Sequence, residues 1–195
     1  MGFTYRLLIN KFPAIIMVVM TLSSKISQYL QNSLIRGKLC RWDKNTVTVY
    51  ISPITAGITN KEFMISQAEK ALMSWNSHFR THNIPLYFQP VVNAAQADII
   101  IHWVKVGRVY EGMCKYLSVI NTSLKKIAID IGLPNSYSGK ETTDLSIYCA
   151  IMHELGHAVG LGHGVEIDDI MYVPHRKNIS EPSENDIYIL KQIYQ

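Results

Sequence analysis

The chain has 195 residues, enough for one domain with a well-formed core but short for two. Hydrophobic residues make up 48% and charged residues 17% of it, a composition that excludes an intrinsically disordered chain. The net charge of +4 is mild and the lysines and arginines are scattered, so the basic face of a nucleic-acid-binding protein is missing. We therefore expect a globular protein with no nucleic-acid partner.

Residues 1–24 have the order of residues found in a secretory signal. Arg6 and Lys11 come first, an apolar run follows over residues 12–22, and serines come next. The run is shorter than the roughly 20 residues that a transmembrane helix needs, but it suits the apolar region of a signal peptide. Because no A-x-A-like cleavage pattern follows, an uncleaved signal anchor and a buried N-terminal helix stay open as alternatives. We expect a secreted protein, or one anchored on the extracytoplasmic side of a membrane.

The next residues are polar and then become periodic. Residues 25–41 show no pattern, so we predict a linker or arm ahead of a domain that covers residues 42–195. Residues 45–52 alternate β-branched side chains, which predicts a strand. A long amphipathic helix follows, because Thr59 and Glu62 have capping-box spacing and apolar residues then recur at intervals of three and four.

The rest of the chain predicts further strands and two helices. The strands are expected over residues 84–91, 97–104, 110–120 and 125–132. A turn-rich loop then leads to a helix that begins near Asp144. A C-terminal helix begins after Ser183, with Asp186 three residues later as its capping partner. One sheet of about five strands with a few helices makes an α/β or α+β fold.

Cys40, Cys114 and Cys149 make an odd number of cysteines. In an exported protein one disulfide and one leftover thiol are expected, and the sequence does not indicate which two residues pair. Three buried thiols that act as small apolar residues are the other interpretation.

The stretch HELGHAVGLGH over residues 153–163 is the strongest functional signal in the chain. His153 and His157 are four residues apart on the predicted helix, so their imidazoles project from the same face. Two neutral nitrogens suit zinc better than calcium or magnesium. Gly160, which can adopt a positive φ, would end the helix and turn the chain so that His163 returns as a third nitrogen ligand.

Glu154 adds a proton acceptor to this stretch. It lies roughly 100° round the helix from His153, so its carboxylate flanks the metal and can take a proton from water. Three protein ligands leave one position open, which is the pattern of a catalytic zinc, whereas structural sites usually close with four ligands. Two other interpretations stay open, namely a non-catalytic zinc-binding surface module and a histidine-rich helix without a metal.

Residues 153–163 resemble the HExxHxxGxxH signature of the metzincin zinc peptidases. Met171, eight positions after His163 in DDIMYVP, resembles the methionine turn of the matrixin branch, the matrix-metalloproteinase-like peptidases. Trp42, the helix around Trp75, the ADIII strand and the C-terminal helix also resemble matrixin elements.

This resemblance implies a metzincin-like zincin domain with one mixed, twisted sheet, an amphipathic helix, an active-site helix and a C-terminal helix. It implies a zinc-dependent metalloendopeptidase that hydrolyses internal peptide bonds of proteins. His153, His157 and His163 would hold one catalytic zinc ion. Glu154 would act as general base and then as general acid, and Met171 would form an apolar floor beneath the metal.

The resemblance also implies where a substrate lies. Tyr172 and the residues after it, including Pro174, would form the wall of the main specificity pocket. An extended protein or peptide substrate would lie antiparallel on the sheet edge at residues 113–118. We expect a monomer that contacts a membrane only if its N-terminal segment is an uncleaved anchor.

The chain departs from the matrixin pattern at several positions. Gly164 stands where matrixins usually have serine, and Val173 comes between the tyrosine and the proline of the methionine turn. Residues 105–132 have no counterparts of the side chains that hold a structural zinc and calcium in animal members, so we predict that this second metal site is absent. Cys40 lies just ahead of the domain, where a zymogen thiolate could bind the zinc, but the surrounding consensus is missing.

Overall fold

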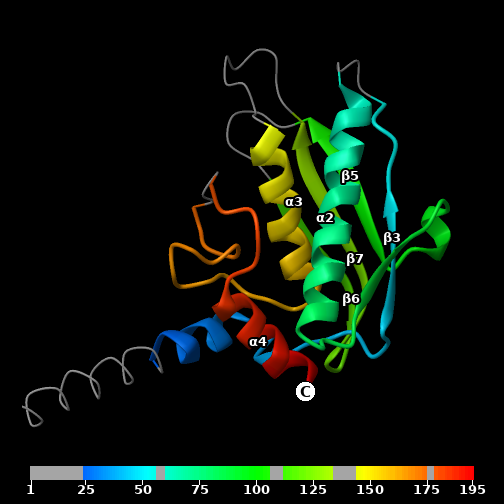
Figure 1. Cartoon of the computed structure of the whole chain (residues 1–195). Helices are drawn as coiled ribbons and strands as arrows, with labels where there is room; N and C mark the ends of the chain where they lie inside the picture. The colour runs from blue at the N-terminus through cyan, green and yellow to red at the C-terminus, as the bar shows by residue number, and fades with distance from the viewer. Residues whose placement is uncertain (1–23, 56–59, 106–111, 134–143, 175–177) are drawn as a thin grey trace, which may run out of the picture.

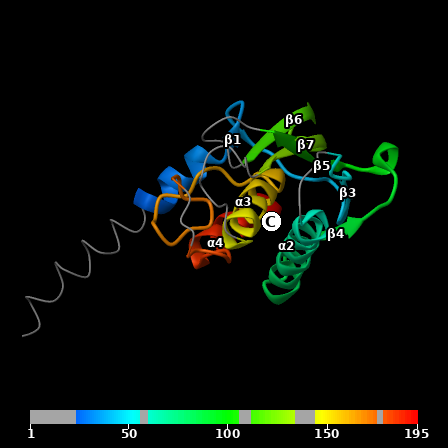
Figure 2. The ribbon, with the colours of Figure 1, turned by 90° about the horizontal axis from the view of Figure 1, so that it is seen from above.

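The computed structural model shows a five-stranded main sheet with two long helices packed on one of its faces (Figure 1). It describes residues 24–55, 60–105, 112–133, 144–174 and 178–195. Helices α2 (Lys61–Thr81) and α3 (Asp144–Ala158) lie side by side on the same face of the sheet (Figure 1, Figure 2). The shorter helix α4 (Glu184–Tyr194) lies near the C-terminal end of α3.

The sheet contains five strands and is mixed, as predicted. The strands are β3 (Thr46–Ile51), β4 (Tyr87–Pro90), β5 (Ile99–Lys105), β6 (Gly112–Ile120) and β7 (Ser123–Leu133). Their order is β4-β3-β5-β7-β6, and every pair is parallel except β6 with β7 at one edge. Ile99 and Ile101 are fully buried in the central strand β5, as a nearly continuous apolar sequence predicts.

The helix starts follow the predicted capping chemistry at one of two places. In α4 the predicted capping box is present, since the Ser183 hydroxyl accepts from the Asp186 N–H and the Asp186 carboxylate accepts from the Ser183 N–H. The N-cap of α2 is instead Asn60, which has a left-handed φ of 70° and makes no side-chain capping bond. Asparagine tolerates that conformation better than most residues. Thr59, the predicted partner of Glu62, lies outside the described residues.

Aromatic side chains of α2 connect the sheet to α3. Trp75 and Phe79 are fully buried. The Trp75 indole Nε1 donates a hydrogen bond of 3.0 Å to Met152 O in α3. The Phe79 ring packs edge-on against Phe88 of β4, with ring centroids 5.3 Å apart. Because these contacts are buried and specific, α2 holds α3 at a defined place on the sheet.

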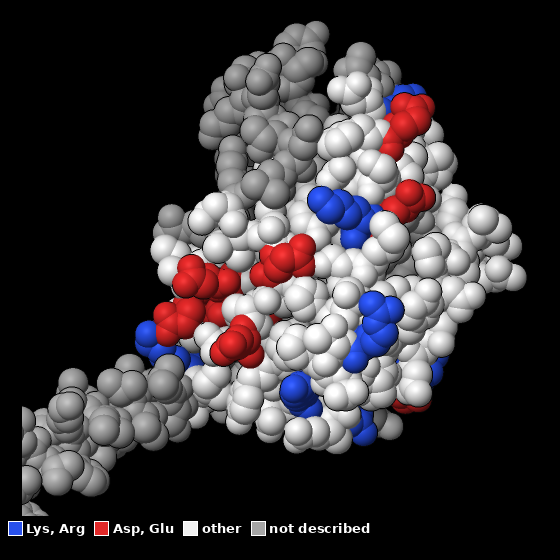
Figure 3. Space-filling view, in the orientation of Figure 1, with Lys and Arg blue, Asp and Glu red and all other residues white. Residues whose placement is uncertain are grey.

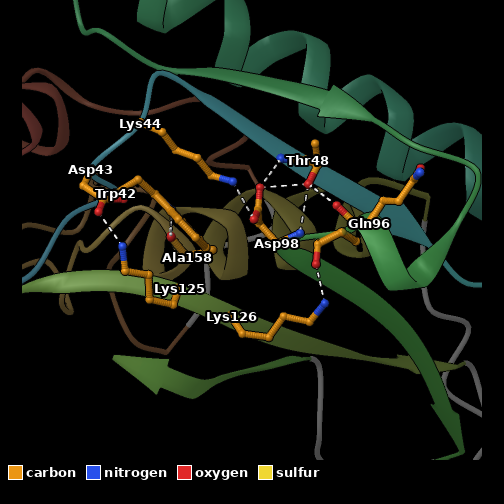
Figure 4. A network of polar contacts seen from close by, with 10 residues as sticks. Trp42, Asp43, Lys44, Thr48, Gln96, Asp98, Lys125, Lys126 and Ala158 are labelled. Carbon is orange, nitrogen blue, oxygen red and sulfur yellow. Dashed lines mark hydrogen bonds and ion pairs between the residues drawn. The ribbon is translucent and has the colours of Figure 1, made fainter. Parts of the chain in front are cut away.

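A polar network fastens the start of the domain to the sheet (Figure 4). Asp98, just before β5, accepts hydrogen bonds from the Thr48 N–H at 2.7 Å and the Thr48 hydroxyl at 2.8 Å, and it forms an ion pair with Lys44 at 2.7 Å. Burial raises the pKa of Asp98, but these donors outweigh burial and hold the pKa below its ordinary value. Nearby, Trp42 Nε1 donates to Ala158 O at 2.9 Å, which connects the first residues of the domain to the end of α3.

The segment ahead of the domain differs from the unpatterned arm expected over residues 25–41. Residues 24–32 form a helix, and β1 (Leu34–Ile35) pairs with β2 (Lys38–Leu39) in a short hairpin. Tyr29 is fully buried against the rest of the chain. The described residues of this helix contain three apolar side chains, Ile26, Tyr29 and Leu30, too short a run to predict a stable helix, whose stability comes mostly from tertiary packing.

All three cysteines lie in the described part of the chain, and the structure places none of them in a disulfide. Cys40 and Cys149 are buried and Cys114 is half-buried, which agrees with the interpretation of cysteines as small apolar residues. Among the described residues, the structure contains no helix of the length and apolarity that crossing a bilayer requires. The apolar run over residues 12–22 lies outside them.

Trp75→Ala should lower the free energy of unfolding by about 3–5 kcal/mol, because it leaves a cavity where α2, α3 and the sheet meet. Met73→Ala on the same helix is the control, since Met73 is 65% exposed and its loss should change stability by less than about 0.5 kcal/mol. Urea unfolding followed by circular dichroism measures both variants. Equal destabilisation by the two substitutions would contradict this account of the core.

Candidate metal centre

Three histidines come together where α3 ends. His153 and His157 lie one turn apart on α3, and His163 lies in the loop that follows. One ligand nitrogen from each histidine lies within 4.8 Å of the other two, so the group could hold a metal ion. His153 is buried, His157 is half-buried and His163 is exposed, so the group is accessible from the loop side.

Hydrogen bonds to backbone carbonyls orient two of the rings. His153 Nδ1 lies 2.9 Å from Ile170 O, and His157 Nδ1 lies 2.8 Å from Leu161 O. A carbonyl oxygen only accepts, so the proton of each neutral ring is on Nδ1 and the lone pair is on Nε2. Bonds of this kind are the usual support of metal-binding histidines.

The positions of the ring nitrogens fit zinc. His153 Nε2 and His157 Nε2 are 3.1 Å apart. Two lone pairs that face each other at this distance repel, whereas a cation held by both nitrogens is attracted to each. Nitrogens bonded to a tetrahedral zinc ion at about 2.0–2.1 Å lie roughly 3.3 Å apart, which is close to the observed separation. A set of three neutral imidazoles is also a donor set that zinc prefers.

A glycine turn places the third histidine. Gly160 has a φ of 100°, as predicted, and its N–H donates to His157 O at 2.9 Å. The Leu161 N–H donates to Gly156 O at 3.0 Å, which completes a Schellman motif at the end of α3. A Cβ at position 160 would lie 2.4 Å from the Cys40 carbonyl oxygen. The backbone conformation and the close approach of Cys40 therefore both require glycine here.

Glu154 lies against the edge strand of the sheet. It is 4% exposed, and a Cβ added at Gly112 of β6 would lie 2.6 Å from the Glu154 Cγ. Burial raises the pKa of the Cys114 thiol, and the negative charge of Glu154 raises it further. The Glu154 carboxylate thus lies in a poorly solvated place between α3 and β6, where its interactions with charge are stronger than in bulk water.

Met171 packs against α3, and its role as an apolar floor beneath the metal stays a prediction. It is fully buried, and a Cβ at Gly156 would lie 2.3 Å from the Met171 Sδ. Gly156 therefore leaves the space that the methionine side chain occupies. Tyr172 is half-buried and Pro174 is exposed at the end of this described loop. Their role in forming a pocket wall stays a prediction.

Asp169 closes the loop after the third histidine, a role that the sequence analysis did not identify. It is 2% exposed, and its Oδ2 accepts from the Val165 N–H at 3.0 Å and the Glu166 N–H at 2.8 Å. Its Oδ1 accepts from the Ser183 hydroxyl at 2.7 Å. A Cβ at Gly164 would lie 2.6 Å from the Asp169 Cβ. Gly164, the departure from the usual serine, therefore makes room for this buried carboxylate.

Asp186 connects α4 to the histidine centre. It is fully buried, and it accepts hydrogen bonds from the Ile170 N–H at 2.8 Å, the Ser183 N–H at 2.8 Å and the Tyr29 hydroxyl. Burial raises the pKa of Asp186 above its ordinary value, although these donors lower it. Because Ile170 O also bonds to the His153 ring, Asp186 holds the residue that orients His153. The capping pattern indicated Asp186 for the helix start alone, since its other contacts come from distant parts of the chain.

Cys40 does not belong to the histidine group. The group of possible metal ligands in the described residues consists of the three histidines. The Cys40 Sγ lies 3.6 Å from Lys38 O in the hairpin, and burial raises the pKa of its thiol. The structure therefore does not place a Cys40 thiolate on the metal. The predicted absence of a second metal site stays a prediction, because part of residues 105–132 lies outside the described residues.

Acidic side chains gather on the face of the molecule that carries the loop between α3 and α4, and basic atoms lie at the edge of this group (Figure 3). Lys25 forms an ion pair with Glu166 of this loop. The exposed or half-buried acidic residues of this stretch are Glu166, Asp168, Glu181 and Glu184.

Gly160→Ala should lower the free energy of unfolding and weaken zinc binding, because alanine opposes the left-handed turn and its Cβ meets the Cys40 backbone. Gly37→Ala is the matched control, since Gly37 has a φ of 76° but nothing within 4 Å of the added Cβ. The control should lose about 1–2 kcal/mol from the backbone conformation alone and keep its zinc affinity. Chemical unfolding and zinc titration measure both effects. Equal losses in both variants would show that the contact with Cys40 is unimportant.

The comparison with known proteins agrees with this geometry. Residues 41–195 match the family described as Matrixin. Matrix metalloproteinase-20 of Homo sapiens is 26% identical to this chain over 141 residues, which cover 70% of the chain and 28% of that protein. The chain thus aligns with less than a third of the length of this relative. Because the matched residues include most of the chain and all three histidines, the chain belongs to the matrixin family.

Proposed function

We propose that this protein is a zinc-dependent metalloendopeptidase that hydrolyses internal peptide bonds of proteins. The observation that carries the proposal is the convergence of three histidines beside a buried glutamate on one helix of a matrixin domain. The three rings account for metal binding. Glu154, 4% exposed and next to the first of these rings in the sequence, accounts for proton transfer.

His153, His157 and His163 would hold the zinc ion. When bound there, zinc supplies a Lewis acid that polarises the scissile carbonyl and lowers the pKa of the attacking water. The residues of the chain orient the ligands and transfer the proton. His153 and His157 keep their Nε2 lone pairs directed at the metal position through the Nδ1 bonds to Ile170 O and Leu161 O.

Glu154 is the proposed general base and then the general acid. Its carboxylate would take a proton from water as the water attacks the carbonyl carbon, and would then give that proton to the leaving amine. The close packing of Gly112 of β6 against the Glu154 side chain limits the positions that the carboxylate can take. A carboxylate held in one position loses less entropy when it accepts the proton at the right place.

The substrate is proposed to lie in extended form along β6. This strand is at the edge of the sheet, and its side chains alternate between two environments. Cys114 and Tyr116 are half-buried, and the Tyr116 hydroxyl donates to His157 O at 2.9 Å. Met113 and Leu117 are 43% and 59% exposed. An edge of this kind can pair with an added antiparallel strand, and Tyr172 and Pro174 would contact one side chain of that strand.

The site of action is proposed from the N-terminal residues. A basic flank, an apolar run over residues 12–22 and a polar exit support a secreted or extracytoplasmically anchored protein. N-terminal sequencing of the mature protein distinguishes these alternatives. A first residue shortly after residue 22 supports release, and a retained apolar run supports an anchor.

Glu154→Gln should keep zinc bound but lower peptide hydrolysis by at least about 10²–10⁴-fold, because the amide cannot accept a proton from water. Glu69→Gln, at an exposed position of α2, is the control and should leave hydrolysis unchanged. Zinc stoichiometry and cleavage of a mixed peptide library, with and without a chelator, measure the two properties. Full activity in Glu154→Gln would exclude Glu154 as the base. Zinc binding without any hydrolysis by the parent protein would favour a non-catalytic zinc-binding module.

His163→Ala should weaken zinc affinity more than about 100-fold, since losing a direct ligand costs more than losing an outer contact. His102→Ala is the control, because His102 is an exposed histidine of β5 outside the metal group and should leave the affinity unchanged. Competition with a fluorescent zinc chelator gives both values. An unchanged affinity in His163→Ala would show that the third ligand is another residue.

A further inference from the structure

The loop that carries His163 rests on the N-terminal helix of residues 24–32. In Figure 1 this helix, in blue, lies beside the orange loop that follows α3. The backbones are in direct contact, since a Cβ at Gly162 would lie 2.0 Å from Asn32 O. Residues 24–40 precede the part of the chain that matches the matrixin family. A segment outside the matched region is therefore in contact with the metal centre.

Asn32 bonds to the peptide group that follows the third histidine. Its Nδ2 donates to His163 O at 2.9 Å, and its Oδ1 accepts from Gln28 Nε2 at 2.9 Å. The N–H of the same peptide group belongs to Gly164 and donates to Met171 O at 2.8 Å. This peptide group is therefore held from both sides, by the N-terminal helix and by the methionine turn.

Ser33 bonds to the peptide group between Leu161 and Gly162, one residue ahead of His163. The Gly162 N–H donates to Ser33 Oγ at 2.9 Å, and the Ser33 hydroxyl donates to Tyr29 O at 3.0 Å. Ser33 is 2% exposed, so water does not replace this bond easily. A single hydroxyl thus connects the N-terminal helix to the turn that leads into the histidine.

Two further contacts hold the N-terminal helix against the same region. The Tyr29 hydroxyl donates to the buried Asp186 carboxylate at the start of α4. Lys25 forms an ion pair with Glu166 in the loop after the histidine. The helix therefore contacts both ends of the segment between α3 and α4, and it cannot shift without disturbing the loop.

His163 depends on such contacts more than the other two ligands do. His153 and His157 lie on α3, and their rings are oriented by carbonyls at 2.9 and 2.8 Å. His163 lies past the end of α3, so its backbone is held by the loop contacts and not by the hydrogen bonds of a helix. A loop held loosely would lower metal affinity, because ordering it would cost conformational entropy on binding.

We propose that Asn32 and Ser33 are positioning residues for the third zinc ligand, His163. In this proposal the N-terminal helix supports the metal centre by holding the loop that carries this ligand. The proposal deepens the proposed function and rests on its zinc site. Asn32 holds the peptide group after His163, and Ser33 holds the peptide group before Gly162. Neither residue touches the metal or a substrate in this role.

The test is the zinc affinity of the full chain carrying Asn32→Ala and Ser33→Ala, measured by competition with a fluorescent chelator at a temperature where the metal-free protein is folded. Outer contacts of metal ligands typically contribute 10–100-fold in affinity, so the double variant should bind zinc at least about tenfold more weakly. Gln31→Ala, on an exposed position of the same helix, should bind like the parent. His163→Ala marks the loss expected when the ligand itself is missing.

Cobalt provides a readout that a general loss of stability does not change. The visible absorption of bound Co²⁺ reports the number and geometry of its ligands, so the double variant should show a weaker and shifted spectrum at metal saturation. Ser33→Thr keeps the hydroxyl. In a chain that retains Asn32, this variant should show the parent spectrum. An affinity and a spectrum equal to those of the parent in the double variant would overturn the proposal.

Two features of the design keep this result separate from other failures. Asn32 is exposed, so Asn32→Ala alone should leave the protein folded and still weaken zinc binding several-fold. An unchanged affinity in that single variant would count against the proposal even if the double variant does not fold. If the parent binds zinc tightly but cleaves no peptide, the peptidase proposal fails while the affinity comparison still decides the role of Asn32 and Ser33.

Discussion

The left-handed turn at Gly160 is the constraint on which the metal centre depends. A helix can place two histidines four residues apart on one face, but it cannot place a third ligand opposite them. The chain has to leave the helix and return, and it does so through a positive φ at a position where the Cys40 backbone approaches closely. Both conditions exclude a side chain at Gly160. The spacing between the second and the third histidine is therefore a consequence of backbone geometry as much as of metal chemistry.

The turn brings the loop back, and buried polar groups keep it there. Asp169 and Asp186 lie in a region from which water is nearly excluded, and each accepts several hydrogen bonds from loop or helix-end N–H groups. Burying a carboxylate is costly unless donors surround it, so each acid specifies one arrangement of the donors around it. Through Ile170 this arrangement reaches the His153 ring. The methionine turn and the ligand geometry are thus parts of one hydrogen-bonded structure.

Local patterns were enough to predict most of the elements. Alternating β-branched residues predicted β3, and the apolar intervals of three and four predicted α2, because burial on one face imposes those periods. The capping box predicted the start of α4 since all its atoms lie within four residues. The patterns failed at the N-terminal helix, where Tyr29 and Ser33 pack against residues more than a hundred positions away. They also failed to explain Gly164, whose neighbour Asp169 fills the space beside it.

The sequence by itself determined which residues could bind a metal, because HExxHxxGxxH gives the type of each candidate ligand, the spacing along the helix and the residue that can turn the chain. The sequence also determined the fold class, because the periodicity of apolar residues that distinguishes helices from strands is a local property of the chain. Only the tertiary structure decided what holds the third histidine in place. Asn32, Ser33 and Asp169 act through hydrogen bonds to backbone groups. Nearly every residue type carries the same backbone N–H and carbonyl, so the sequence does not show which backbone groups are bonded. Such contacts become visible when distant segments are brought side by side.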